Sequence, residues 1–167
     1  EASADIGKAH AEQVQKGVDV TLQGPFELLG QTHDLIFGWN WNEYNNDHFS
    51  ALGSGSNSFN FGSWDNYIDK PDSYNPLLDF NINSRQSGYF AATRLNFTDQ
   101  LHLILGARGT NYSYNYYSKV IGSTRDPVNY HIGETGVVTP YAGLVYDLTP
   151  EQSVYVSYTD IFKPQSA

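Results

Sequence analysis

The stretch VVTPYAGLVYDLTPEQSVYVSYT, residues 137–159, decides the fold class of this 167-residue chain. It contains two runs in which every second residue is apolar, and the four residues TPEQ (149–152) separate them. The first run places Val138 and Leu144 on one face, and the second places Val154 on the corresponding face. A period of two is the signature of a β-strand, so this stretch predicts an antiparallel hairpin with one apolar and one polar face.

The same period of two recurs in four runs nearer the N-terminus. Most of the runs are about 9–12 residues long, the length that a tilted strand needs to cross a bilayer, whereas strands of soluble proteins cluster near about 5–6 residues. Only Ala2 to Val14 has helix-forming character. We predict an all-β, antiparallel, up-and-down meander of about six long strands, at 15–23, 34–42, 87–97, 101–112, 138–148 and 153–159.

The connections between these runs alternate strictly in length. Three are short, at 24–32, 98–100 and 149–152, and two are long, at roughly 45–84 and 113–136. In an antiparallel meander this alternation places every long loop at one end. Long loops at one end and tight turns at the other are typical of bacterial outer-membrane barrels.

The chemistry of the two faces favours a membrane barrel over a soluble sandwich. Aromatic residues lie near the ends of the apolar faces, as interfacial girdles require. Charged residues with Gly and Thr occupy the opposite faces, which suits a wet lumen. The girdle residues are Trp39, Trp41, Phe97 and Tyr146, and the charged residues are Asp19, Arg94, Arg108 and Asp147.

Composition excludes several other classes of protein. Asp and Glu number 18 against 9 Lys and Arg, a formal charge of -9 that argues against binding to nucleic acid. Cys is absent, so thiolate metal sites and Cys nucleophiles are excluded. The five His show no metal-ligand spacing, and no GxSxG elbow occurs. We therefore predict no catalytic residue and no metal site.

Three stretches resemble TonB-dependent ferric-siderophore receptors of the pyoverdine/coprogen type. They are KGVDVTLQGPFELLGQTHDLIFG (16–38), RQSGYFAATRLNFTDQLHLILGAR (85–108) and TPYAGLVYDLTPEQSVYVSYTDIFKPQ (139–165). The resemblance implies a 22-stranded barrel filled by a plug domain. We expect residues 1–167 to be one partial barrel domain without the plug.

The resemblance also implies the function of the parent receptor. That protein would lie in the bacterial outer membrane, contact its lipid, bind a ferric siderophore and import it when TonB acts through the plug. It would be a transporter, with the ferric siderophore as its transported ligand and no cofactor. Because the isolated segment exposes its apolar face, we expect it to self-associate.

Candidate ligand-binding residues come from the loops and from one strand. Aromatic side chains give a bulky chelate a large contact area at low entropic cost. If that strand persists, Tyr112, Tyr114 and Tyr116 point to the same lumen side as Arg108. The alternative is that these tyrosines are girdle residues or pack between loops. The predicted substrate-binding residues are Trp64, Tyr67 and Tyr74 in the first long loop, with Arg108, Tyr112, Tyr114 and Tyr116.

Two other interpretations fit the same periodicity. The first is a soluble β-sandwich or small barrel that binds carbohydrate or another ligand, since Tyr, Trp and Asn in loops suit a lectin. The second is a structural, porin-like channel without a plug.

Overall fold

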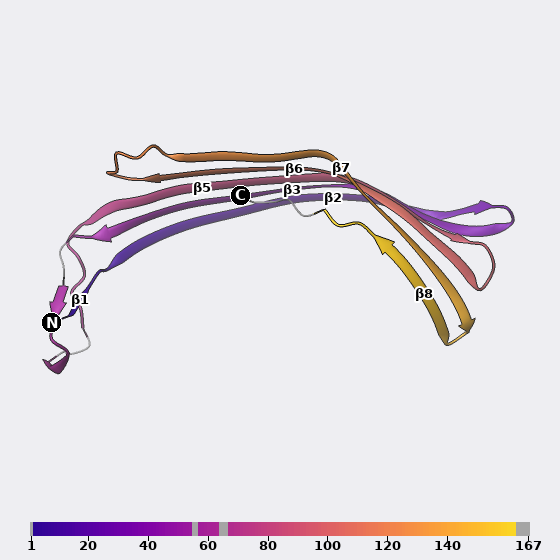
Figure 1. Cartoon of the computed structure of the whole chain (residues 1–167), viewed down its shortest axis with the longest axis horizontal. Coiled ribbons are helices and arrows are strands. Elements are labelled where there is room, and N and C mark those ends of the chain that lie inside the picture. The colour runs from indigo at the N-terminus through magenta and orange to yellow at the C-terminus, as the bar shows by residue number, and fades with distance from the viewer. Residues whose placement is uncertain (1, 55–56, 64–66, 163–167) are drawn as a thin grey trace. The chain divides into compact units, whose positions relative to one another are not determined.

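The computed structural model describes residues 2–54, 57–63 and 67–162, and nearly all of them are in β-strands (Figure 1). Successive strands of the main sheet pair with each other, which makes an antiparallel up-and-down meander as predicted. Its six strands are β2 (Gly7–Leu28), β3 (Gln31–Gly53), β5 (Tyr74–Asn96), β6 (Leu101–Val120), β7 (Val128–Thr149) and β8 (Gln152–Thr159). A second sheet pairs β1 (Ala2–Ala4) with β4 (Asn57–Phe59), and a 3-10 helix, η1, covers Phe61–Ser63.

The chain divides into two compact units, which we describe separately. Unit 1 contains residues 1–15, 44–83 and 114–131. Unit 2 contains residues 16–43, 84–113 and 132–167. The two longer connections of the main sheet belong to unit 1, and its three short turns belong to unit 2.

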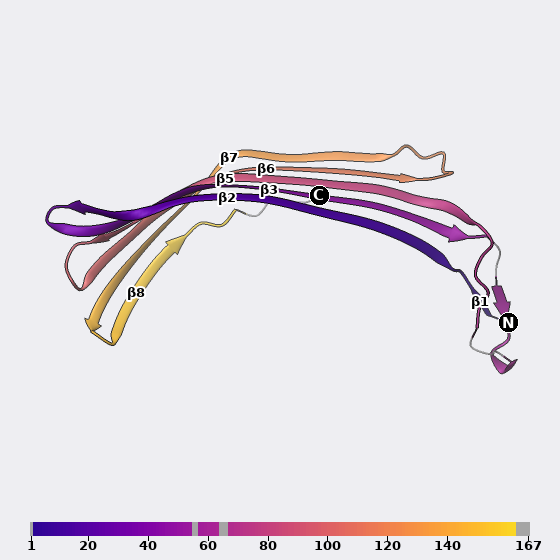
Figure 2. The ribbon, with the colours of Figure 1, turned by 180° about the vertical axis from the view of Figure 1, so that it is seen from behind.

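The short turns of unit 2 follow from local turn chemistry (Figures 1 and 2). Leu29 and Gly30 join β2 to β3 with φ angles of 54° and 77°, and two positive values are typical of a type I′ turn. The hydroxyl oxygen of Thr98 accepts the backbone N–H of Leu101 at 3.0 Å between β5 and β6. After β7, the hydroxyl oxygen of Thr149 accepts the N–H of Glu151.

The hairpin of β7 and β8 has the register that its apolar pattern predicts. Leu144 lies opposite Val156, and Tyr146 lies opposite Val154, so the apolar residues of both strands share one face. A register shift between Asp147 and Thr149 brings the strands into the turn. The alternation of residues 137–159 therefore predicts both strands and their pairing correctly.

The strands in unit 1 extend further than the sequence predicts. β3 continues to Gly53 and β5 begins at Tyr74, while β6 and β7 reach Val120 and Val128. The connections are therefore 54–73 and 121–127, and the predicted loops at 45–84 and 113–136 are too long. The helix-forming segment Ala2–Val14 is also strand, in β1 and the start of β2.

Pairs of polar side chains between strands explain why the sequence analysis assigned these extensions to loops. The amide nitrogen of Asn83 donates to the side-chain oxygen of Asn45 at 3.0 Å, and that of Asn81 donates to the carboxylate of Asp47. Asn and Asp have low intrinsic β-propensity, but side-chain pairs directly across an antiparallel ladder stabilise it. The Asn and Asp residues of these extensions favour loops, and they mask the alternation that the extensions carry, such as Leu78, Phe80 and Ile82 in β5.

The apolar face of unit 2 is exposed. Val20, Leu22 and Val156 have 58%, 60% and 66% of their surface exposed, and Ala51 in unit 1 is the one buried apolar residue among those described. A soluble sandwich would bury such a face against a second sheet, so the described structure does not support that interpretation. Within residues 2–54, 57–63 and 67–162, no helix is long and apolar enough to cross a membrane.

The turn between β2 and β3 yields a stability prediction. Leu29 adopts a left-handed conformation, which costs a residue with a Cβ roughly 1–2 kcal/mol and which Asn adopts more readily. We expect Leu29→Asn to stabilise the full-length protein by about 1 kcal/mol, measured as the urea midpoint of refolding in detergent. Leu28→Asn, in β2, is the control and should bring no gain. Equal effects of the two substitutions would contradict this account of the turn.

Candidate functional site

The candidate residues of the first long loop fall in different places. Trp64 lies outside the described residues. Tyr67 lies in the connection 54–73 and has 66% of its surface exposed. Tyr74 is the first residue of β5 and is half-buried, so its predicted position within a loop is wrong. The reason is that Asn and Asp are frequent at the start of β5, and these residues have low intrinsic β-propensity.

Tyr114 and Tyr116 belong to a row of aromatic rings in unit 1. β6 continues to Val120, which meets the condition that the strand persists past Arg108. The ring of Tyr116 stacks on that of Tyr130 at 5.0 Å and on that of Phe80 at 6.4 Å, between ring centroids. Tyr114 lies 6.0 Å from Tyr130. These separations are typical of favourable offset or tilted aromatic pairs.

The row ends at His48, whose ring stacks on Phe80 with centroids 4.5 Å apart. We call His48, Phe80, Tyr114, Tyr116 and Tyr130 the aromatic row; its members come from β3, β5, β6 and β7. All five are half-buried, so part of each ring remains accessible. The row can therefore stack against a polarisable ligand while its tyrosine hydroxyls form hydrogen bonds.

The sequence indicated only two members of this row. Tyr114 and Tyr116 were predicted because they share the side of Arg108 on β6. His48 fits the pattern of a solvated loop histidine. Phe80 and Tyr130 lie in segments that were predicted to be loops. The signal that could have found Phe80 and Tyr130 is the alternation of residues 78–82 and 128–132, whereas the place of His48 follows only from the extent of β3.

Arg108 is fixed against the sheet in unit 2. One of its terminal nitrogens donates to the side-chain oxygen of Asn40 at 2.9 Å, and its Nε donates to the hydroxyl of Thr110 at 3.2 Å. The guanidinium covers Gly88, where an added Cβ would lie 3.0 Å from it. Two of its five N–H donors are thus used in hydrogen bonds within the described part of the sheet. Tyr112, also in unit 2, is half-buried.

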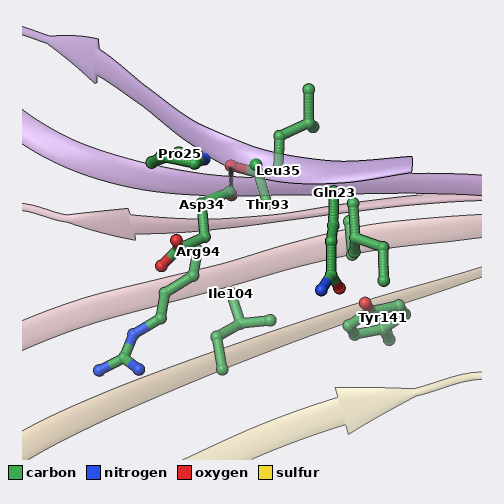
Figure 3. A pocket seen from close by; sticks show the side chains of 11 residues that line it. Gln23, Pro25, Asp34, Leu35, Thr93, Arg94, Ile104 and Tyr141 are labelled. Atoms are coloured by element: carbon green, nitrogen blue, oxygen red, sulfur yellow. Dashed lines mark hydrogen bonds between the residues drawn. The ribbon is translucent and has the colours of Figure 1, made fainter. Parts of the chain in front are cut away.

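A hollow of about 630 Å³ opens on the polar face of unit 2 (Figure 3). Side chains from five strands line it, namely Gln23, Asp34, Arg94, Ile104 and Tyr141. An amide, a carboxylate, a guanidinium and a phenol therefore face the same space. This mixture suits a polar protein surface or a hydrated ligand. The alternation in the sequence places Gln23, Asp34, Arg94 and Tyr141 on this side of their strands.

On the opposite face of unit 2, the apolar stripe ends at an ion pair. Trp39 and Trp41 lie on the same side of β3 as Phe37, because every second residue of a strand faces the same way. Glu43 is the next residue on that side. The carboxylate of Glu43 accepts two hydrogen bonds from Arg85 of β5, at 2.9 and 3.0 Å. Tryptophan followed by an exposed ion pair is the pattern of a boundary between hydrocarbon and water.

Comparison with known proteins agrees with this geometry. Residues 4–167 match the family described as TonB dependent receptor-like, beta-barrel. The chain belongs to the TonB-dependent receptor family. Among the described residues, no cluster of three or more His, Asp or Glu side chains is arranged to hold a metal ion.

Among curated relatives of this TonB-dependent receptor segment, the ferric-pyoverdine 358 receptor of Pseudomonas putida is 59% identical over 162 residues. The ferripyoverdine receptor of Pseudomonas aeruginosa is 35% identical over 173 residues. Each match covers 96% of this chain and 19% of the relative, so the chain spans about a fifth of their length.

Solved receptors have the same strand arrangement. The pyoverdine-bound outer-membrane receptor FpvA of Pseudomonas aeruginosa superimposes with a TM-score of 0.73 at 34% identity, over 96% of this chain and 22% of that one. The alcaligin receptor FauA of Bordetella pertussis has a TM-score of 0.67 at 24% identity, over 95% and 23% of the two chains, which shows the fold alone. The prediction of a receptor segment rather than an enzyme is confirmed.

A close contact beside the hollow yields a second prediction. A Cβ added to Gly106 would lie 2.3 Å from the ring of Tyr141, whereas one added to Gly109 would meet nothing within 4 Å. We expect Gly106→Ala to destabilise the full-length receptor by about 1–3 kcal/mol because the Tyr141 ring must move. Gly109→Ala, on the same strand, should be neutral or slightly stabilising. The urea midpoint in detergent measures both, and similar midpoints would show that Tyr141 does not need this space.

Proposed function

We propose that this chain forms part of the barrel wall of a bacterial outer-membrane receptor, which binds a ferric siderophore of the pyoverdine class and imports it with energy from TonB. The observation that carries the proposal is the 59% identity to the ferric-pyoverdine 358 receptor over 96% of the chain. Membership of the TonB-dependent receptor family supports the coupling to TonB.

The outer-membrane position rests on the apolar face of unit 2. Its Leu, Val and Tyr side chains are covered by no other described part of the chain, and hydrocarbon is the environment that makes their exposure favourable. Trp39 and Trp41 mark the outer boundary of this apolar band. The ion pair of Glu43 and Arg85 then lies in water beyond it.

Ligand binding rests on the aromatic row. Its rings are half-buried and already ordered against one another, so a ligand can stack on them with little loss of side-chain entropy. We propose Tyr114 and Tyr116 as ligand contacts on this basis. The other predicted contacts, Trp64, Tyr67, Tyr74, Arg108 and Tyr112, are proposed from their residue type and position only.

The domain assignment is part of the same proposal. Residues 1–167 form one segment of a larger barrel, with β2 and β8 at the edges of its sheet. An unpaired edge in hydrocarbon leaves N–H and C=O groups without partners, so both strands pair with further strands of the receptor. The hollow on the polar face then faces the barrel interior, where a plug domain through which TonB acts would contact it.

Ligand binding by the aromatic row can be tested in the full-length receptor. We expect Tyr116→Leu to weaken binding of ferripyoverdine up to about tenfold, because a stacked aromatic contact contributes roughly 0.5–1.5 kcal/mol beyond its buried area. Tyr89→Leu, at an exposed position on the apolar face, should leave the dissociation constant unchanged. Equal dissociation constants for the two variants would remove the aromatic row from the binding site.

The exposed apolar face also predicts the behaviour of the chain on its own. Each large apolar side chain gains roughly 1.5–3 kcal/mol when it leaves water, and many are exposed here. We expect the isolated chain to self-associate in buffer and to become monodisperse only in detergent. Analytical ultracentrifugation with and without detergent measures this, and a detergent-free monomer would contradict the assignment of this face to lipid.

A further inference from the structure

β6 and β7 are neighbours in the main sheet, and their contacts show which residues lie opposite each other. In unit 2, the backbone N–H of Asp147 donates to the carbonyl oxygen of Gln100 at 2.8 Å, so these two residues are directly opposite. In an antiparallel pair, each step back along β7 is a step forward along β6. Counting in this way places Tyr141 opposite Gly106, and the ring of Tyr141 does occupy the space that a Cβ on Gly106 would take.

The same count fails in unit 1. Continued along both strands, it would place Tyr130 opposite Tyr117. Instead, Tyr130 stacks on Tyr116, on the other side of β6, with ring centroids 5.0 Å apart. On the side of Tyr117, Nδ1 of His131 lies 2.8 Å from the side-chain oxygen of Asn115. Both contacts require a register displaced by one residue, so β7 contains one residue more than β6 between the two sections.

The extra residue is Gly136. Within Val128–Thr149 it alone has a positive φ, 69°, the left-handed conformation of the glycine in a G1 β-bulge. A bulged residue leaves the ladder, so its N–H needs another acceptor. The N–H of Gly136 donates to the side-chain oxygen of Asn111, on β6, at 2.8 Å. The conformation and this substitute hydrogen bond together identify Gly136 as the bulge.

The bulge changes the side of β7 on which the preceding residues lie. Side chains alternate along a regular strand, so in a regular β7 Tyr130 would share the side of Val138 and Leu144. Both of these residues are exposed and belong to the apolar face of unit 2. Because of the extra residue, Tyr130 instead lies on the side of Tyr114 and Tyr116, where it joins the aromatic row.

We propose that Gly136 is a positioning residue for the ligand site: its bulge turns Tyr130 into the aromatic row, where Tyr130 contacts the ferric siderophore together with Tyr114 and Tyr116. This rests on the proposed binding of that ligand by the row. The ring of Tyr130 lies 6.0 Å from that of Tyr114 and 5.0 Å from that of Tyr116, so its loss from this side would open a gap in the row. Gly136 itself acts only through Tyr130.

Two changes at position 136 have opposite consequences. A residue with a Cβ, and above all a β-branched one, rarely adopts a positive φ. Gly136→Val therefore favours a regular strand in which the register of unit 2 continues and Tyr130 turns to the side of Tyr117. Deletion of Gly136 removes the extra residue together with the bulge, so Tyr130 stays opposite Tyr116.

Disulfide formation in the full-length receptor in detergent reports the side of Tyr130 directly. This chain contains no Cys, so pairs can be introduced as Tyr116→Cys with Tyr130→Cys and as Tyr117→Cys with Tyr130→Cys. Residues directly opposite in an antiparallel pair lie within the Cα separation that a disulfide needs. We expect the 116–130 disulfide to predominate in the otherwise unchanged receptor and after deletion of Gly136, and the 117–130 disulfide to predominate with Gly136→Val.

Gly122→Val is the matched control. Gly122 has a φ of 80° in the connection 121–127, and a Cβ added there meets nothing within 4 Å, as at Gly136. The substitution therefore imposes the same backbone strain outside the strand. It should leave the 116–130 disulfide predominant.

The dissociation constant of ferripyoverdine, measured on receptors without introduced cysteines, tests the role in binding. Gly136→Val and Tyr130→Leu should each weaken binding up to about tenfold, because each removes one stacked aromatic contact. Deletion of Gly136 should bind more tightly than Gly136→Val, which a merely structural glycine would not explain. Gly136→Val combined with Tyr130→Leu should bind no more weakly than Tyr130→Leu, and a further loss would show that Gly136 does not act through Tyr130.

The two measurements separate the possible failures. A predominant 116–130 disulfide with Gly136→Val would overturn the positioning role. A predominant 117–130 disulfide after deletion of Gly136 would overturn it too, and this result is decisive even if Gly136→Val does not fold. If the disulfides form as expected but ferripyoverdine binds equally to wild type, Gly136→Val and Tyr130→Leu, Gly136 still sets the side of Tyr130, and it is the aromatic row that has no role in binding.

Discussion

The structure depends on a sheet that satisfies its backbone hydrogen bonds between neighbouring strands while one of its faces is left without protein cover. Val20, Leu22 and Val156 are each more than half exposed, and Ala51 is the one buried apolar residue among those described. In water such a face would drive association, whereas against hydrocarbon it costs nothing. The lengths of the strands, the tight turns and the boundary at Trp39, Trp41 and the Glu43–Arg85 pair all agree with this constraint.

Because the exposed apolar side chains gather on one face of unit 2, the polar and charged groups lie on the other face and in the strand extensions of unit 1. In unit 1, pairs of Asn and Asp side chains and the stacked rings of His48 and Phe80 link β3 to β5, and the aromatic row offers partly exposed rings. In unit 2, the polar face combines a fixed Arg108, a hollow lined by Asp34, Arg94 and Tyr141, and a chain of hydrogen bonds through two histidines. Together these features place cationic, carboxylate and phenol groups on the polar face of unit 2.

Two buried histidines show how much depends on partners that are distant in the sequence. His33 and His102 look alike as residues, and each follows a short turn. Asn96 contacts both rings: its backbone N–H donates to Nδ1 of His33, and its side-chain oxygen lies 2.7 Å from Nδ1 of His102. No pattern in the sequence specifies this, since the partners lie 63 and 6 positions from Asn96.

The alternation of apolar and polar residues by itself determined the six strands of the main sheet, their order and the face exposed to lipid, because side chains in a strand alternate regardless of distant contacts. It also indicated Tyr114 and Tyr116 as candidate ligand contacts, because they lie an even number of residues beyond Arg108 and therefore on the same side of the strand. Only the tertiary structure decided how far β3, β5, β6 and β7 extend into sequence rich in Asn and Asp, and that His48, Phe80 and Tyr130 complete the aromatic row. Polar strands are stabilised by pairs such as Asp47 with Asn81, and residues 34 positions apart become neighbours only when the strands are aligned.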